Sequence, residues 1–170
     1  SVGYGQASNW LSRRFLKYAV RSAKYCSVRD AGSREMTIKL GVERDLPVVP
    51  DMAFGLQPPA RRALKRPGFD IAISPMVYLR PGSWPVEDND GYRRLVAMWA
   101  DLVSAVVRRG DRAHLFDSSP GDMPAVHDTW ECLDATTRAS CTITCPESPD
   151  ALLEFYRGVE IVIASRLHGV

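Results

Sequence analysis

The sequence predicts an α/β protein built around a parallel sheet with helices on its faces. Short apolar segments alternate along the chain with segments whose apolar residues recur at helical spacing. This alternation of strand and helix favours right-handed crossovers between parallel strands.

Of the 170 residues, 45% are hydrophobic and 25% are charged, the balance of an ordinary soluble globular protein. That balance excludes a disordered tail, a collagen-like repeat and a disulfide miniprotein.

The N-terminal part of the chain alternates helix and strand patterns. Apolar residues at helical spacing predict a helix over 9–24, and Asn9 or the residue before it can cap the start. A strand pattern follows at 25–28, and a second helical pattern begins at Ser33. Residues 46–51 predict a brief strand that ends in a turn.

The composition changes after residue 56. Pro58-Pro59 is followed by four basic residues and then by Pro67-Gly68. Adjacent prolines and dense positive charge make a poor core segment. We therefore expect an interdomain linker over 58–68, between a first-domain segment at 1–57 and a second-domain segment at 69–170. The alternative is a solvated loop inside one domain.

The C-terminal part shows the more regular alternation. It predicts strands at 69–74, 112–117, 141–145 and 159–164, separated by helical patterns at 92–109, 125–133 and 150–157. Gly110 is expected to end the longest of these helices. Ligands of parallel sheets lie outside the carboxyl ends of the strands. This rule points to Ser74-Pro75, 117–119 and 165–169 as the segments that carry chemistry.

The charge balance argues against two classes of partner. Lys and Arg number 22 against 20 Asp and Glu, a net charge of +2, whereas proteins that neutralise many phosphates carry a larger basic excess. No apolar run approaches the roughly 20 residues that cross a bilayer, and no signal-peptide pattern opens the chain. We expect neither a nucleic-acid partner nor a transmembrane segment.

The cysteines and histidines do not predict a metal site. The four cysteines show no CxxC spacing, and the three histidines are scattered along the chain. We interpret the cysteines as reduced thiols of a cytoplasmic protein.

The sharpest local motif is Ser165-Arg166-Leu167-His168-Gly169, which follows the most apolar strand pattern. Arg166 offers a fixed cationic fork for a carboxylate or phosphate, and His168 can donate a proton near neutral pH. Together they suit an anionic substrate that needs protonation. The alternative is a structural histidine bonded to a neighbouring loop, with Arg166 paired to a surface carboxylate.

A second motif runs from Ser27 to Ser33. Arg29 stands where a strand pattern ends, and Ser33 is placed to cap the following helix, which together suit an anion site. The alternative is a local ion pair between Arg29 and Asp30, worth under about 1 kcal/mol. Asp51 follows another short apolar run, and we favour a turn residue there over a site carboxylate.

The order of these motifs resembles the polysaccharide pyruvyl transferase family. The resemblance rests on SVRDAGS, a helix ending in LGV, VVPDMAF, the proline-rich break, a new ISP strand and IASRLHG, and it runs across essentially all 170 residues. SVRD-x-x-S and SRLHG are its most specific parts. The family is similar to GT-B glycosyltransferases, with two Rossmann-like domains facing a central cleft. Because members begin before Ser1 and continue past Val170, we expect a fragment holding the end of the first domain and most of the second.

The resemblance implies a phosphoenolpyruvate-dependent transferase of cell-surface polysaccharide synthesis. It would join the pyruvyl unit to two hydroxyls of a sugar as a cyclic ketal and release phosphate, with no metal and no cofactor beyond this donor substrate. Carried over onto this sequence, Arg29 and Arg166 would hold the anions, Leu167 would line the pocket and His168 would be the general acid. We expect the general base to lie outside this segment.

Two other functions fit the same residues. One is a GT-B glycosyltransferase or nucleotide-sugar epimerase, whose cleft binds a nucleotide-sugar diphosphate. The other is a non-catalytic α/β module that holds an anion. In the leading hypothesis the acceptor is a sugar or a lipid-linked oligosaccharide, and a lipid-linked acceptor would bring the protein to the inner face of the membrane.

Overall fold

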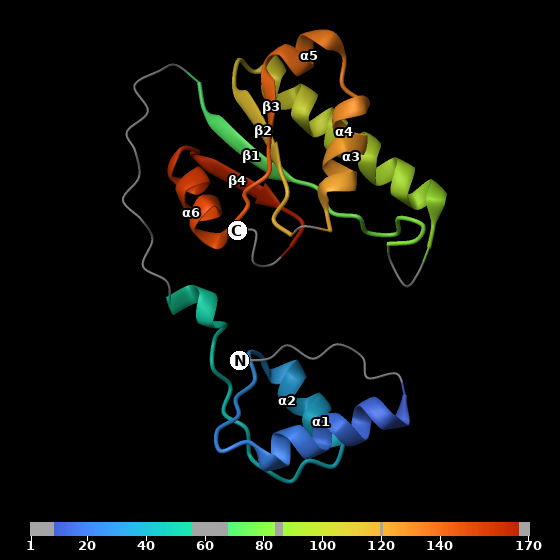
Figure 1. The fold of residues 1–170 in the computed structure, drawn as a ribbon, viewed down its shortest axis with the longest axis vertical. Coiled ribbons are helices and arrows are strands. Elements are labelled where there is room, and N and C mark those ends of the chain that lie inside the picture. Colours follow the sequence, from blue (N-terminus) through green and yellow to red (C-terminus); the bar gives the residue numbers. More distant parts are fainter. Residues whose placement is uncertain (1–8, 56–67, 84–86, 120, 167–170) are drawn as a thin grey trace. The chain divides into compact units, whose positions relative to one another are not determined.

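The computed structural model describes residues 9–55, 68–83, 87–119 and 121–166 (Figure 1). The chain divides into two compact units, residues 1–58 and 59–170. The linker expected over 58–68 lies almost entirely outside the described residues.

Over its described residues, 9–55, the first unit contains the helices α1 (Trp10–Ser22) and α2 (Ala31–Lys39) and the 3-10 helix η1 (Met52–Gly55). Asn9 caps α1, as predicted, because its side chain accepts a hydrogen bond from the N–H of Ser12 at 2.7 Å. The cap expected at Ser33 is wrong. Asp30 is the N-cap of α2, and its carboxylate accepts from the N–H of Ser33 at 2.6 Å.

The two strands expected in this unit are reduced to one parallel bridge between Val28 and Val48. The N–H of Val28 donates to the carbonyl of Pro47 at 3.0 Å, and the N–H of Val49 donates to the carbonyl of Val28 at 2.8 Å. Val28 also belongs to a small buried apolar cluster with Val20, Val42 and Leu46. The bridge therefore brings the SVRD and VVPD motifs side by side.

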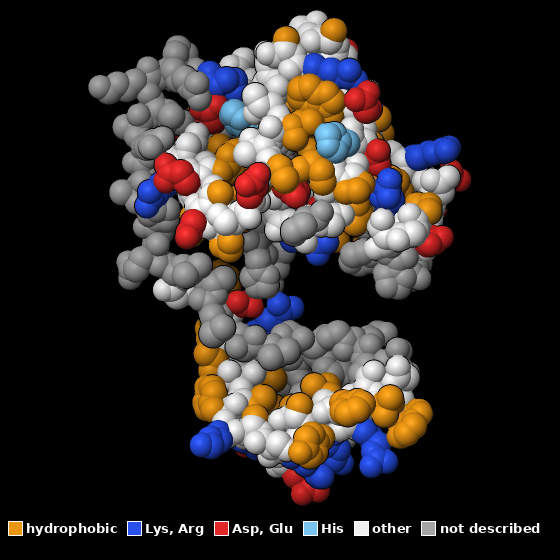
Figure 2. Space-filling view, viewed as in Figure 1, with side chains coloured by type: hydrophobic (Ala, Val, Ile, Leu, Met, Phe, Trp, Pro, Cys, Tyr) orange, Lys and Arg blue, Asp and Glu red, His pale blue; other side chains and the backbone are white. Residues whose placement is uncertain are grey.

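Helix α1 presents an apolar face to solvent within its unit. Trp10, Phe15 and Tyr18 are 69%, 66% and 71% exposed, and Figure 2 shows hydrophobic side chains gathered over this part of the first unit. The contact of α1 with the small core is made through Val20, which is buried, and Leu16, which is partly buried.

The second unit is a sheet with helices on both faces, as the sequence predicts (Figure 1). All pairings between its strands are parallel, and the order is β3-β2-β1-β4. The strands are β1 (Asp70–Ser74), β2 (Arg112–Phe116), β3 (Cys141–Thr144) and β4 (Ile161–Ala164). The helices are α3 (Asn89–Arg108), α4 (Met123–Glu131), α5 (Ala135–Ala139) and α6 (Pro149–Arg157).

Alternate residues of each strand face opposite layers of helix. Ile71 and Ile73 of β1 pack in one cluster with Val103 of α3 and Val126 of α4. Ala72, between them, packs on the other face in a cluster that includes Phe155 of α6. Helices thus lie on both faces of the sheet, the arrangement in which ligands bind at the ends of the strands and in the loops that extend from them.

Candidate functional site

The carboxyl ends of the strands bring together the polar segments that the sequence singles out. The Ser74 hydroxyl, at the end of β1, donates to the hydroxyl of Ser118, just after β2, at 3.0 Å. The N–H of Ser165, just after β4, donates to the carbonyl of Ser74 at 3.2 Å. The central strand β1 is thus linked to both neighbouring strands at this edge, and Arg166 extends from it.

Arg166 is held by a buried carboxylate. Asp122 is fully buried, and its two oxygens accept from the guanidinium, Oδ2 from Nε and Oδ1 from Nη2 at 2.9 Å. Oδ1 also accepts from the backbone N–H of Val77 at 3.2 Å. The hydrogen bonds and negative charge of Asp122 raise the pKa of Arg166, against a smaller opposing effect of burial. The arginine is therefore a permanent, oriented cation.

Some N–H donors of the Arg166 guanidinium make no hydrogen bond to the described residues. An arginine has five N–H donors, and the side-on pairing with Asp122 engages one on Nε and one on Nη2. Nη1 has no partner among the described residues, so the edge between Nη1 and Nη2 is available to a second anion. The side chain as a whole is 35% exposed.

Asp122 is a site residue that sequence reasoning missed. It occupies the N-cap position of α4, where an aspartate is expected to bond the first-turn N–H groups, but its side chain makes no cap hydrogen bond. The carboxylate is used by Arg166 and Val77 instead. The available signal was an aspartate preceding a Met-Pro helix start, and that signal by itself predicts a cap.

In the first unit, Arg29 lies between two carboxylates. Its Nε is 3.4 Å from Oδ2 of Asp30, and its Nη1 is 3.8 Å from Oδ2 of Asp51. The local ion pair with Asp30 is thus present, and Asp51, favoured from sequence as a turn residue, lies close to the motif arginine. Asp51 is the more buried of the two carboxylates, with a side chain only 17% exposed.

Leu167 and His168 lie outside the described residues, so their predicted roles stay predictions. Within the described ranges, no group of three or more His, Cys, Asp or Glu side chains could hold a metal ion. In the same ranges no helix is both long enough and apolar enough to cross a membrane.

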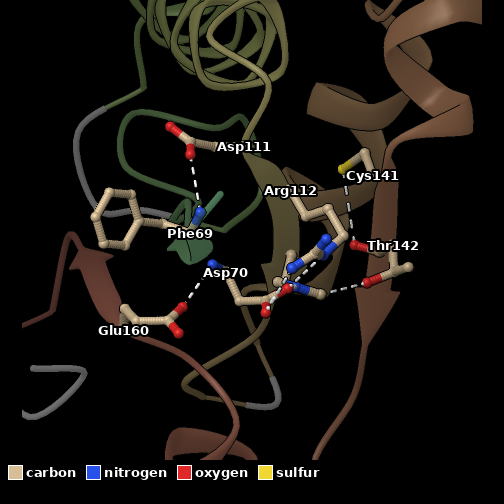
Figure 3. Close-up of polar contacts among 8 residues, drawn as sticks. Phe69, Asp70, Asp111, Arg112, Cys141, Thr142 and Glu160 are labelled. Atoms are coloured by element: carbon tan, nitrogen blue, oxygen red, sulfur yellow. Dashed lines mark hydrogen bonds and ion pairs between the residues drawn. The ribbon is translucent and has the colours of Figure 1, made fainter. Parts of the chain in front are cut away.

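A second charged cluster lies at the opposite, amino edge of the sheet (Figure 3). Asp70 is fully buried and accepts from Arg112 at 2.8 and 3.0 Å, and His114 Nε2 lies 2.7 Å from its Oδ1. The N–H of Asp70 donates to Glu160 at 2.6 Å, and His114 Nδ1 lies 2.8 Å from the Thr142 hydroxyl. These contacts join the four strands, so we assign the cluster to stability rather than to the site.

Comparison with known proteins gives one match. The model of the polysaccharide pyruvyl transferase family matches residues 1–170. No curated protein and no solved structure matches the chain. The match covers the two motifs that carry Arg29 and Arg166. The chain belongs to the polysaccharide pyruvyl transferase family.

Proposed function

We propose that the protein transfers the pyruvyl unit of phosphoenolpyruvate to two hydroxyls of a sugar, forming a cyclic ketal and releasing phosphate. The observation that carries this proposal is the arrangement of Arg166 and Asp122. A cation fixed at the carboxyl edge of a parallel sheet, with one donor edge free, suits a small anionic substrate. Membership of the family supports a pyruvyl donor as that anionic substrate.

Phosphoenolpyruvate carries a phosphate and a carboxylate, and we assign one arginine to each domain for holding them. Arg166 would engage one anion through its free edge, which needs no reorientation because Asp122 already fixes the plane of the guanidinium. Arg29 would engage the other from the first domain. We take residues 1–57 as the C-terminal part of the first Rossmann-like domain of a GT-B-like enzyme, 58–68 as the linker and 69–170 as most of the second domain.

His168 is our candidate for the general acid. Its proton would add to the methylene carbon of phosphoenolpyruvate, with the electron pair of the double bond forming the new C–H bond. The neighbouring carbon becomes oxocarbenium-like, and the first sugar hydroxyl attacks it and loses its proton. The bond to phosphate then breaks, and the second hydroxyl closes the ketal and loses its proton. One released proton restores His168, and the other leaves with the products.

The acceptor is a sugar or a lipid-linked oligosaccharide in the synthesis of a cell-surface polysaccharide. With a lipid-linked acceptor, the protein would work in the cytoplasm at the inner face of the membrane. Leu167 would line the donor pocket, and we place the general base outside this segment. No metal or further cofactor takes part in the proposed steps.

Phosphate release from phosphoenolpyruvate tests the proposal. With the full-length protein and an acceptor glycan, Arg166→Lys and His168→Ala are each expected to lower turnover by on the order of 10²-fold or more. Arg108→Lys is the matched control, because Arg108 is exposed in the last turn of α3, at the amino edge of the sheet and away from the carboxyl edge. Unchanged turnover in both site variants would overturn the mechanism. Nucleotide-sugar consumption without phosphoenolpyruvate would instead favour a glycosyltransferase. Anion binding with neither phosphate release nor nucleotide-sugar consumption would favour a binding module.

A further inference from the structure

A cavity of about 240 Å³ lies at the carboxyl edge of the sheet, on the side away from Arg166. It is lined by the loop after β2, the loop after β3 and the start of α6, and it opens to solvent. The hydrogen bond between Ser118, which lines the cavity, and Ser74 connects its wall to the end of β1. The cavity is therefore part of the same sheet edge as Arg166 but separate from the arginine itself.

Asp117 brings to this cavity a buried carboxylate oxygen that lacks a hydrogen-bond donor among the described residues. The residue is only 7% exposed, it lines the cavity, and its Oδ1 accepts no hydrogen bond from the part of the chain that the structure describes. Buried carboxylate oxygens in folded proteins are almost always hydrogen-bonded, because they have given up their hydration. A donor from a bound ligand would complete the site.

The remaining lining groups decide which kind of donor fits. A bound cation is disfavoured because α6 begins at the cavity and presents its positive end there. A bound anion is disfavoured by the carboxylates of Asp117 and Glu147. A neutral hydroxyl carries no charge and can both donate and accept hydrogen bonds, so neither the helix end nor the carboxylates disfavour it.

The serines supply the complementary donors. The Ser118 oxygen already accepts from Ser74, and the Ser148 oxygen accepts from the N–H of Ala151 at 3.1 Å, so each can still donate its own proton. Pro146, Pro149 and Leu152 provide an apolar wall against which the C–H face of a sugar ring can pack. A volume of about 240 Å³ is below the range of drug-sized pockets and suits a single ring.

We propose that this cavity is a subsite for one neutral sugar ring of the acceptor, whose adjacent hydroxyls donate to Asp117 and accept from the serines. The assignment to the acceptor rests on the proposed function; the recognition of a neutral diol does not. A ribose offers the same diol chemistry, so the test must separate a hexose from a nucleotide.

Binding is measured without phosphoenolpyruvate, so that a failure of the transfer reaction leaves this test unaffected. The probes are the methyl glycosides of glucose, galactose and mannose, and uridine diphosphate. We expect at least one glycoside to shift the amide NMR signals of 117–119 and 147–152 in the full-length protein. Asp117→Asn is expected to weaken that binding about tenfold or more, as removal of a charge-assisted hydrogen bond does.

Two further variants are measured in the same binding experiment, one outside the cavity and one inside it. Asp101→Asn removes an exposed carboxylate of α3 and is expected to leave glycoside affinity unchanged. Ser119→Val fills part of the cavity and is expected to weaken binding while the unfolding midpoint is retained. Binding of uridine diphosphate with none of the glycosides would overturn the assignment to the acceptor. Binding of no probe, or equal glycoside affinity in Asp117→Asn, would overturn the subsite.

Discussion

Asp122 and Arg166, 44 residues apart in the sequence, form a two-point ion pair at the carboxyl edge of the second sheet. The pair joins the N-terminus of α4 to the turn after β4, and the N–H of Val77 adds a third element. A fully buried carboxylate is stable only when its oxygens are paired, and here both are. The same contacts that stabilise Asp122 therefore orient the motif arginine.

Replacing Asp122 with asparagine is expected to affect both stability and activity. The substitution keeps the shape and one acceptor for Val77 but removes the charge facing Arg166. Because Arg166 is about one-third exposed, water compensates part of the loss, and we expect the free energy of unfolding to fall by about 1–3 kcal/mol. Urea denaturation measures this, and phosphate release should fall in parallel because Arg166 loses its fixed plane.

Glu154→Gln is the control for this prediction. Glu154 pairs with Arg157 at 2.8 Å on the exposed surface of α6, and such pairs contribute roughly 0–1 kcal/mol. If Asp122→Asn were no more destabilising than Glu154→Gln, the buried pair would not be the anchor inferred here.

Cys145 reports on the charge of Asp117. Desolvation of the thiol, followed by the negative charge of Asp117, raises the pKa of Cys145, which is an exposed residue. Asp117→Asn removes that charge, so the thiolate fraction at mildly alkaline pH should rise and alkylation of Cys145 should accelerate a few-fold. Peptide-level mass spectrometry measures the rate, with the exposed Cys132 as an internal control. An unchanged ratio of the two rates would show that the carboxylate does not act on this thiol.

Much of the second unit could be predicted from the sequence because its strands are short, apolar and separated by long amphipathic helices. The helix α5 was missed because five residues, Ala135–Ala139, are too few to show a helical period. In the first unit, Val28 and Val48 gave strand patterns of the same apparent quality, but only one bridge forms between them. In the first unit, apolar runs therefore predict burial, but they do not predict how many residues form strand pairings.

The site was predictable only in part, since Arg29, Arg166 and the two carboxylates beside Arg29 belong to motifs, whereas Asp122 does not. Arg29 and Arg166 both follow strand patterns, and the rule on carboxyl ends points to the segment that holds Arg166. Asp122 has the sequence context of a helix cap, and only the tertiary fold shows that its side chain pairs with Arg166 instead. Asp30 and Ser33 are both good caps three residues apart, and the extended backbone of Asp30 decides between them.

The turn into β1 depends on the absence of a side chain at Gly68. Its φ is +82°, and an added Cβ would lie 2.8 Å from the carbonyl oxygen of Gly110. Gly68→Ala is therefore expected to cost about 1–2 kcal/mol for the left-handed backbone and about 1–3 kcal/mol more for the clash. Gly110, where the sequence predicted the end of α3, also has a positive φ of +86°, but a Cβ there meets nothing within 4 Å.

Gly110→Ala is thus a matched control for Gly68→Ala that isolates the backbone cost. Urea denaturation of both variants should show the smaller loss of stability at Gly110. Equal losses would mean that the chain around Gly68 moves to accommodate the methyl group without cost.

The cap of α2 should make the first unit sensitive to acid. The hydrogen bond from the N–H of Ser33, with a smaller contribution from the charge of Arg29, lowers the pKa of Asp30 in the folded protein. A group whose pKa is lowered by folding stabilises the fold above its unfolded pKa, and this stabilisation is lost as the pH falls through the folded value. Asp30→Ala should therefore lower the unfolding midpoint at neutral pH, and the difference from the unchanged protein should shrink in acid.

The neutral cap Asn9 provides the control. Its side chain accepts from Ser12 without a charge, so Asn9→Ala should lower the stability by the same amount at every pH. A scan from about pH 7 to about pH 2 measures both, and a difference for Asp30→Ala that did not vary with pH would contradict the charged cap.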